Sequence, residues 1–418
     1  MINSIKHGRE LTELSACRIC GDSHLHTVFS LGCLPLANGY LSYHQLEMLE
    51  QHYPLEVCFC DQCKLVFLKH VVSPETLFRE YSYVTGASNP LITHFNGLAK
   101  TIIQRFGVPP KSLVIDIGSN DGTLLKAFKN YDMETVGVEP AANIAKIASS
   151  CGIFTLNNYF NKDTAREILE KAGKAKVITA TNVFAHVHDI KDFLIGINTL
   201  LDDGGILVIE VPYLVDLING HEFDTIYHEH LSYFMVGSLN ELLMQFNLHI
   251  IDVERIPVGG GSIRIYANKQ MCQVAESVQE LITFEKEQGF YNIEKYYQFG
   301  QEISLIKHNL FSLLCELKEK EKIIAGYGAS AKGTILLNYC NIDLHILDFI
   351  VDSTSLKQWL YMPGVHIPIF PEDYFHHRPP DYFLLLVWNF KEAILTKEAN
   401  YRKQGGKFVL PFPEPHIV

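Results

Sequence analysis

The chain has 418 residues, which predicts two or three domains, and it carries a formal net charge of −12 at pH 7. Hydrophobic residues make up 47% and charged residues 20% of it, a composition that supports large folded cores. An acidic balance without a basic block argues against a nucleic acid as partner. The first residues lack the apolar core of a signal peptide, and no apolar run is long enough to cross a membrane. We therefore expect a soluble cytoplasmic protein, a monomer or a small homo-oligomer, without a membrane partner.

Six of the ten cysteines lie before residue 64, and this distribution indicates a local metal site rather than a secreted disulfide framework. Cys17 and Cys20 form one C-x-x-C knuckle, and Cys60 and Cys63 form a second. Two facing knuckles supply the four thiolates of a closed, structural zinc site. Cys58 is an alternative ligand to Cys60, although the C-x-x-C spacing favours Cys60. A pair of redox motifs is the competing interpretation, but no thioredoxin-like strand–helix–strand context surrounds them.

The region after the second knuckle predicts a short strand at 65–68 and a helix that begins near Pro74. Residues 81–90 form a polar and aromatic segment that contains Tyr81 and Tyr83. This segment is either a packed linker or a flap that holds tyrosyl groups over a pocket.

Residues 112–125 predict the first strand, loop and helix of a doubly wound α/β domain. An apolar run ends at Asp116, and a turn bounded by Gly118 and Gly122 leads into a helical pattern. The glycines permit close approach of a ligand, and the N–H groups of the helix start face the same place. The spacing is not G-x-G-x-x-G, so a nicotinamide dinucleotide is not expected. Asp116 before the turn and Asn120 within it suit an ammonium group, such as that of S-adenosylmethionine (SAM); a turn without a ligand is the alternative.

Strands and helices continue to alternate after this loop. Glu139 ends the second strand, about 20 residues after the Gly-rich loop, where an acid that binds ribose is expected. Asn158 follows the third strand, near the expected adenine, and Asn182 ends the fourth. Two later strands separated by three glycines predict an antiparallel hairpin at the sheet edge, as in class I SAM-dependent methyltransferases. The predicted strands after the first cover residues 133–140, 152–156, 176–182, 205–211, 249–254 and 262–267.

Ligands of open α/β sheets bind beyond the carboxyl ends of the strands, and two histidine-bearing segments follow such ends. His186 follows strand four, and the run Tyr227, His228, Glu229, His230 follows strand five. Most of the 19 histidines are expected to be structural or solvated, but these segments lie on the edge where chemistry is expected. His228 and His230 are an alternative metal pair, for which no third ligand with matching spacing is evident.

Residues 322–333 predict a buried strand, a Gly-rich turn and a helix, which is the start of a second Rossmann-like domain. Gly326, Gly328 and the helix N-terminus are expected to hold a diphosphate, with Lys332 adding positive charge. A turn without a ligand is one alternative. Ala331 stands at the third glycine position of a dinucleotide fingerprint, a replacement that some fingerprints allow, so NAD is another.

Six features of the chain together resemble one family, the sugar C-methyltransferases, which act on nucleotide-linked keto-deoxysugars. In chain order they are the paired cysteine knuckles, Tyr-Ser-Tyr at 81–83, Asp-Ile-Gly-Ser-Asn-Asp-Gly at 116–122, Asn-Val-Phe-Ala-His-Val at 182–187, Tyr-His-Glu-His-Leu-Ser-Tyr-Phe at 227–234 and Gly-Tyr-Gly-Ala-Ser-Ala-Lys-Gly at 326–333. The resemblance covers nearly the full length. It implies a zinc-binding domain, a SAM-binding domain and a C-terminal α/β domain that helps hold a dTDP- or GDP-linked sugar. It also implies a catalytic group consisting of His230 as base, with Tyr81, His186, Tyr227 and Glu229 around the reacting carbon.

The chemistry of C-methylation defines what such a site must supply. SAM is a methyl electrophile, so the acceptor carbon must first become a carbanion equivalent. In a 4-keto sugar, C3 lies next to the carbonyl and forms an enolate when it loses its proton. Neutral histidine suits this step, so we predict His230 as the base and Glu229 as the group that fixes its environment. His186 and a tyrosyl hydroxyl are the expected donors to the enolate oxygen, and Tyr83 is expected near the substrate.

We therefore predict three domains: a small zinc-binding domain at 1–74, a class I SAM-methyltransferase domain with a Rossmann-like sheet at 75–268, and a nucleotide-sugar-binding α/β domain with a second Rossmann-like sheet at 269–418. The predicted function is SAM-dependent C-methylation of a nucleotide-linked 4-keto-6-deoxy sugar at C3. A NAD-dependent nucleotide-sugar oxidoreductase is the alternative.

Overall fold

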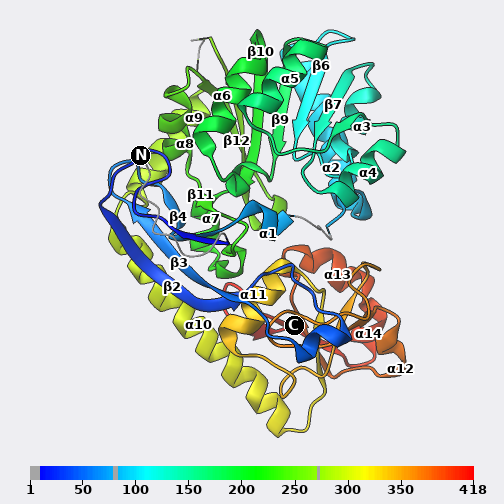
Figure 1. The fold of residues 1–418 in the computed structure, drawn as a ribbon. Coiled ribbons are helices and arrows are strands. Elements are labelled where there is room, and N and C mark those ends of the chain that lie inside the picture. The colour runs from blue at the N-terminus through cyan, green and yellow to red at the C-terminus, as the bar shows by residue number, and fades with distance from the viewer. Residues whose placement is uncertain (1–9, 79–82, 271–273) are drawn as a thin grey trace.

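The computed structural model describes residues 10–78, 83–270 and 274–418 (Figure 1). The large central sheet lies at one end of the molecule in that view, and the C-terminal sheet lies at the other. The N-terminal strands curve along one side between them. This arrangement confirms the predicted α/β fold with a small N-terminal unit and a second parallel sheet near the C-terminus.

The N-terminal unit is an antiparallel sheet with the strand order β11-β4-β3-β2. Its last strand in the sequence, β11, comes from the central part of the chain: Ser232 pairs with Phe67, and Tyr233 pairs with Val66. The strands are β2 (Leu25–Pro35), β3 (His52–Cys60), β4 (Val66–Leu68) and β11 (Ser232–Tyr233). A second, two-stranded sheet pairs β1 (Leu11–Glu13) with β5 (His70–Val72), and α1 (Pro74–Phe78) follows it. The predicted strand at 65–68 and the helix start at Pro74 are confirmed.

The central sheet has seven strands in the order β12-β13-β10-β9-β6-β7-β8. All its pairings are parallel except those of β13, which runs antiparallel to both β10 and β12. The predicted edge hairpin is therefore confirmed. The strands are β6 (Leu113–Ile117), β7 (Glu134–Val138), β8 (Thr155–Leu156), β9 (Ala175–Thr181), β10 (Leu201–Pro212), β12 (His249–Ile256) and β13 (Ser262–Asn268).

Helices cover both faces of the central sheet, which explains why a strand such as β6 is buried along its whole length. One face packs against α2 (Asn89–Phe106) and α3 (Thr123–Lys129), whose apolar side chains share a core with Val114 and Val177. The other face packs against the next group of helices: α5 (Lys162–Ala172), α6 (Ile190–Leu200) and α8 (Val236–Met244). Two further helices follow strands of this sheet in the chain: α4 (Ala142–Ser150) comes after β7, and α7 (Leu214–Asn219) comes after β10.

The C-terminal sheet has the order β16-β15-β14-β17-β18-β19, and only β19 is antiparallel to its neighbour. This parallel core confirms the second Rossmann-like unit. The strands are β14 (Ile324–Tyr327), β15 (Ile350–Asp352), β16 (Ile369–Pro371), β17 (Tyr382–Leu385), β18 (Lys407–Leu410) and β19 (His416–Ile417). The helices are α11 (Ala331–Cys340), α12 (Tyr374–His377), α13 (Lys391–Lys397) and α14 (Ala399–Lys403).

Two helices connect the central and C-terminal sheets, α9 (Glu276–Glu287) and the long α10 (Ile293–Glu319). α10 also packs on the N-terminal sheet, because the rings of Phe29 and Phe299 lie 5.3 Å apart and those of Phe59 and Tyr296 lie 5.0 Å apart. All three units therefore pack as one body, with α10 along one side (Figure 1).

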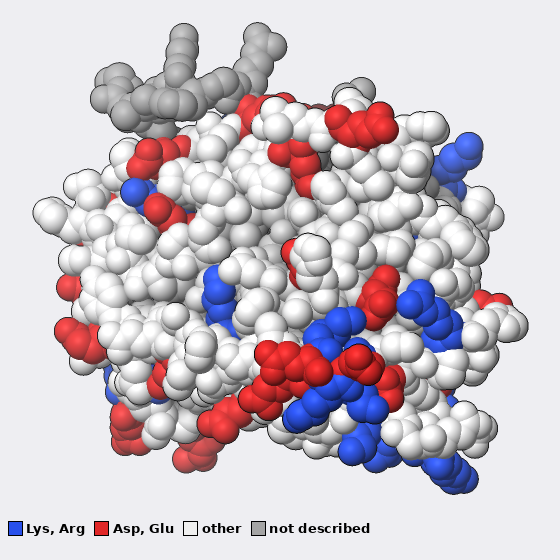
Figure 2. All heavy atoms as spheres, turned by 90° about the horizontal axis from the view of Figure 1, so that it is seen from below, with Lys and Arg blue, Asp and Glu red and all other residues white. Residues whose placement is uncertain are grey.

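On the face seen from below in Figure 1, many basic and acidic side chains lie side by side in the lower part of the view, next to wide uncharged areas (Figure 2). Within the described ranges, no helix combines the length and apolarity that a membrane crossing needs.

Candidate functional site

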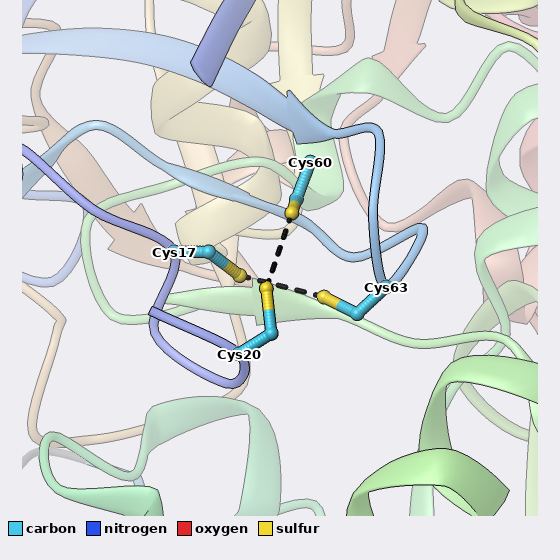
Figure 3. Close-up of side chains that lie close together, drawn as sticks. All are labelled: Cys17, Cys20, Cys60 and Cys63. Atoms are coloured by element: carbon cyan, nitrogen blue, oxygen red, sulfur yellow. Dashed lines mark hydrogen bonds between the residues drawn. The ribbon is translucent and has the colours of Figure 1, made fainter. Parts of the chain in front are cut away.

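The four predicted zinc ligands come together at one end of the N-terminal sheet (Figure 3). The Sγ atoms of Cys17 and Cys63 lie 3.4 Å apart, and those of Cys20 and Cys60 lie 3.5 Å apart. All four sulfurs fall within 4.8 Å of one another. A tetrahedral zinc ion with Zn–S bonds of about 2.3 Å separates its sulfurs by about 3.8 Å, so small adjustments admit the ion. Four thiolates leave no open position for a substrate, and the site therefore braces the fold.

The alternative metal ligands do not join a comparable group. Cys58 is buried on β3, where its thiol contacts Thr27 at 3.7 Å. The His228 and His230 rings hydrogen-bond to two different backbone carbonyls. Among the residues that the structure describes, the four cysteines are the group whose donor atoms converge.

The Gly-rich loop between β6 and α3 depends on its glycines. Gly118 and Gly122 have φ values of +65° and +77°, which side chains with a Cβ rarely adopt. A Cβ on Gly118 would lie 2.3 Å from a methyl carbon of Val183, so the loop could not pack against the segment after β9. The N–H group of Gly118 donates to the carbonyl of Val138 at 2.8 Å. The loop is thus fixed between the ends of β7 and β9.

Asp116 lies buried at the carboxyl end of β6, where Thr179 Oγ1 donates to its Oδ1 at 2.6 Å. Burial raises the pKa of Asp116 to about 7, the bond from Thr179 opposes this shift, and the negative charges of Glu139 and Glu210 add to it. A bound cation would favour the ionised carboxylate, so this position suits a positively charged ligand such as SAM.

Glu139 lies at the end of β7 and holds the Gly-rich loop. Its Oε2 accepts from the N–H of Asn120 at 3.0 Å, and its Oε1 accepts from the N–H of Ala141 at 2.9 Å. Burial raises the pKa of Glu139, and these two bonds lower it. Each carboxylate oxygen can accept a further hydrogen bond, so a ribose hydroxyl fits here.

Two asparagines lie farther along the same sheet edge. Asn182 follows β9 with φ +56°, and its N–H donates to the carbonyl of Glu210 at 2.8 Å. Asn158 is exposed beyond β8, and its Oδ1 accepts from the N–H of Tyr159 at 2.9 Å. Both therefore lie at the carboxyl ends of parallel strands, the edge where ligands of such sheets bind.

Residues 83–86, in the second half of the polar and aromatic segment, lie against the Gly-rich loop. Thr85 N–H donates to Asn120 Oδ1 at 2.9 Å, and Gly86 N–H donates to Asp121 Oδ2 at 3.0 Å. Asn120 Nδ2 in turn donates to the carbonyl of Tyr83 at 3.1 Å. These contacts hold residues 83–86 against the Gly-rich loop. Tyr81 lies outside the described residues.

The two histidine segments meet beside this edge. The rings of His186 and His230 lie 4.9 Å apart in a T-shaped arrangement, and the rings of Tyr227 and His230 lie 4.0 Å apart. Nδ1 of His230 lies 2.7 Å from the carbonyl oxygen of Thr225. Because a carbonyl only accepts, Nδ1 carries the proton and Nε2 is the unprotonated nitrogen. His186, Tyr227 and His230 thus lie together in one cluster.

Both imidazoles of this cluster are kept neutral. Burial lowers the pKa of His186 to about 4. Burial, the neighbouring His186 and the positive charge of Lys332 lower the pKa of His230 well below its usual value, although the bond to Thr225 opposes this. Burial and the charge of Glu229 raise the pKa of Tyr227 well above 10, so its hydroxyl keeps its proton.

Glu229 points toward the N-terminal unit. It is buried, and its Oε1 accepts from Asn38 Nδ2 at 2.7 Å. Asn38 therefore holds this carboxylate from the N-terminal unit, and the charge of Glu229 acts on Tyr227. Sequence reasoning missed Asn38, which stands in an Ala-Asn-Gly turn with no periodicity to mark it.

Lys332 projects from the first turn of α11 toward the central unit. Its Nζ donates to the carbonyl of Gly259 at 2.8 Å and lies 4.5 Å from the centre of the Trp388 ring. Burial raises the pKa of Asp224 to about 6, and the charge of Lys332 and a bond from Trp388 oppose this shift. Lys332 therefore lies where the C-terminal unit meets the His230 cluster, with a buried acid nearby.

The C-terminal Gly-rich turn is held by protein partners. Gly328 has φ +89°, and a Cβ there would lie 2.5 Å from Val387. Ala329 N–H donates to Asp352 Oδ2 at 2.7 Å, and the Ala329 carbonyl accepts from Lys357 Nζ at 2.7 Å. This backbone geometry accounts for glycine at position 328 without a ligand, so a diphosphate at this turn would compete with Asp352.

Family models match three consecutive parts of the chain. Residues 17–78 match the "Putative zinc binding domain", residues 92–253 match a methyltransferase domain, and residues 257–413 match the C-methyltransferase C-terminal domain. The C-methyltransferase NovU of Streptomyces niveus is 35% identical over 407 residues, which cover 97% of each chain.

More distant similarities concern parts of the chain. A ubiquinone biosynthesis O-methyltransferase of Azorhizobium caulinodans is 26% identical over 29% of this chain and 51% of its own. The magnesium protoporphyrin IX methyltransferase structure from Synechocystis, with bound SAH, is 11% identical, has a TM-score of 0.34 and covers 43% of this chain and 83% of its own. The PH0226 protein structure from Pyrococcus horikoshii is 13% identical and has a TM-score of 0.37. The match covers 47% of this chain and 98% of the PH0226 chain. Both scores lie below 0.5, so these two structures add nothing to the assignment.

The full-length similarity and the three matching domains agree with the geometry described above. A four-thiolate cluster lies in the zinc-binding part, and the seven-stranded sheet carries buried acids and neutral histidines at the expected edge. The chain therefore belongs to the C-methyltransferase family and is a SAM-dependent C-methyltransferase with a zinc-binding N-terminal domain.

Proposed function

We propose that this enzyme methylates C3 of a nucleotide-linked 4-keto-6-deoxy sugar, with His230 as the base. The observation that supports this most is the hydrogen bond from His230 Nδ1 to the carbonyl of Thr225. It leaves Nε2 as the one proton acceptor of the ring, beside His186 and Tyr227. A carbon next to a ketone loses its proton to such a base, whereas an alcohol or amine would be methylated without an enolate.

His230 acts as a base because its low pKa keeps it neutral throughout the neutral pH range. After Nε2 takes the proton from C3, the positive charge of the ring is shared through Nδ1 with the Thr225 carbonyl. The enolate oxygen then needs donors, and two groups that carry one lie next to the His230 ring: the N–H of the neutral His186 imidazole and the Tyr227 hydroxyl.

SAM, when bound, supplies the methyl group as an electrophile that the enolate carbon attacks. Asp116, Asn120, Glu139, Asn158 and Asn182 would hold it along the carboxyl edge of the central sheet. Gly118 and Gly122 allow the loop that carries Asn120 its conformation. The chain thereby positions two reactants, and this positioning rather than metal chemistry accounts for the rate.

The sugar nucleotide is proposed to bind between the central and C-terminal units. Lys332 supports this, since its positive charge lies close enough to His230 to change the pKa of that histidine. Tyr83 would approach the sugar from the flap. For the NAD-dependent oxidoreductase, a dinucleotide at the C-terminal turn would have to displace Asp352 from the Ala329 N–H.

The function is tested with a panel of dTDP-, GDP- and CDP-linked 4-keto-6-deoxy sugars. We expect one of them to gain the mass of a single methyl group from SAM. In deuterated buffer without SAM, the same sugar should exchange the proton at C3, because deprotonation precedes transfer. A panel in which no keto sugar gains mass, or in which the methyl group appears on oxygen, would show the proposal to be wrong.

Replacement of Lys332 by alanine is expected to raise the KM of the sugar nucleotide by about 10-fold or more, because a charge-assisted contact to phosphate is lost. The KM of SAM should change by less than about twofold, since Lys332 belongs to the opposite unit. Steady-state kinetics with each substrate varied in turn measures both constants. Lys397→Ala is the control, because Lys397 pairs with Glu372 at the C-terminal surface. An unchanged KM for the sugar nucleotide would remove Lys332 from the substrate site.

A further inference from the structure

Arg18, which stands between the two cysteines of the first knuckle, contacts both catalytic segments. Its Nη1 donates to Ser232 Oγ at 2.5 Å, two residues after His230. Its Nη2 donates to the carbonyl of Val187 at 2.5 Å and to that of His188 at 2.8 Å, directly after His186. One guanidinium therefore bridges two segments that lie more than 40 residues apart in the sequence.

The second knuckle supports the same two segments through the backbone. β4 begins three residues after Cys63 and pairs with β11, which begins two residues after His230. Leu231 lies at the centre of this contact: its carbonyl accepts from Leu68 N–H at 3.1 Å, and its N–H donates to the carbonyl of Ala185 at 2.8 Å. The residue that follows His230 is thus bonded on one side to the zinc-binding unit and on the other to the residue before His186.

From these contacts we infer that Arg18 is a positioning residue for the methyl transfer, and that the zinc knuckle fixes the separation of His186 and His230. The inference rests on the proposed roles of the two histidines. The zinc ion acts only by holding the turn from Cys17 to Cys20, which aims the guanidinium. Arginine suits this role because its planar fork presents several donors in fixed directions, whereas lysine has one ammonium group.

The test is Arg18→Gln, which keeps all four thiolates but cannot reach three acceptors. We expect kcat to fall about 10- to 100-fold, the size expected when reacting groups are displaced by about 1 Å. Zinc content, the Kd of SAM and the circular dichroism spectrum should match those of the wild type. Arg18→Lys should recover part of the lost kcat. The matched control is Arg166→Gln on α5, whose guanidinium pairs with Asp163 at the surface, and its kcat should be unchanged.

A second measurement separates positioning from a general loss of folded protein. Ser232→Ala removes one of the three acceptors and should lower kcat two- to fivefold in the wild type, but by less than 1.5-fold in the Arg18→Gln background. Such non-additivity is expected when two residues act through one contact. Equal effects of Ser232→Ala in both backgrounds, or a wild-type kcat for Arg18→Gln, would overturn the inference.

The outcome also distinguishes this inference from the proposed function. If the wild type methylates a keto sugar and Arg18→Gln does so equally fast, only the role of Arg18 is wrong. If the wild type neither methylates nor exchanges any keto sugar, the proposed function is wrong, and the role of Arg18 in that reaction is wrong with it.

Discussion

Replacement of His230 by asparagine should lower kcat by roughly 100- to 10,000-fold, the usual contribution of a positioned general base. Asparagine can still donate from Nδ2 to the Thr225 carbonyl, so the segment keeps its shape, but it has no nitrogen that accepts the C3 proton. The Kd of SAM should stay within about twofold, because Asp116 and Glu139 belong to other strands. Rapid-quench measurement of methyl transfer and calorimetry with SAM give the two quantities.

The decisive readout for His230 is hydrogen exchange at the sugar. His230→Asn should abolish exchange of the C3 proton with deuterated buffer as well as methylation, because both need deprotonation. His228→Asn is a suitable control: His228 is also buried, but its Nε2 lies 3.1 Å from the carbonyl of Tyr53, away from the cluster. Its kcat should fall by less than about threefold. If the His230→Asn variant retained the wild-type kcat, His230 would not be the base.

Loss of a zinc ligand should destabilise the protein before it affects chemistry. In Cys63→Ser we expect a loss of about 4 kcal/mol or more of unfolding free energy, because losing a bound metal is among the largest effects of single substitutions. In a folding unit of about 60–100 residues each kcal/mol lowers the melting temperature by about 4–8 °C, so the apparent melting temperature of the zinc-binding unit should fall by about 16 °C or more. Calorimetry measures the fall, and elemental analysis should find one zinc ion per wild-type chain and much less in the variant.

The control for the zinc site is Cys58→Ala. Cys58 lies on the same strand as Cys60 but contacts Thr27, so its replacement should leave the zinc content unchanged. Native wild-type protein that contains no zinc, or a Cys58→Ala variant that loses it, would contradict the assignment of Cys17, Cys20, Cys60 and Cys63 as ligands.

Local patterns were enough to predict most of the fold. Apolar runs that end at Asp116 and Glu139 correspond to β6 and β7, because strands buried on both faces need continuous hydrophobic residues. The prediction was less accurate at β8, which covers only Thr155–Leu156. Its first predicted residues, such as Gly152 with φ +76°, belong instead to the turn that ends α4. Glycine next to an apolar run therefore marked the end of a helix.

Contacts between distant segments could not be predicted. Asn38 and Arg18 carry no periodic signal, and they acquire a role only because the N-terminal sheet packs against the segments around His186 and His230. The same holds for β11, a two-residue strand that its own sequence cannot define. The histidine cluster was predictable because the carboxyl ends of parallel strands meet at one edge of a sheet. The bounds of the three domains stay a prediction.

β11 belongs to the N-terminal sheet although it lies far from the other strands of that sheet in the sequence, and this has a consequence for biosynthesis. Until Ser232 and Tyr233 leave the ribosome, β4 has an open edge that can pair with other nascent chains. Roughly 160 residues separate the two strands, which is about 10–30 s of translation at about 5–20 residues per second. During this interval the edge of β4 is a place where a chaperone would prevent pairing between nascent chains.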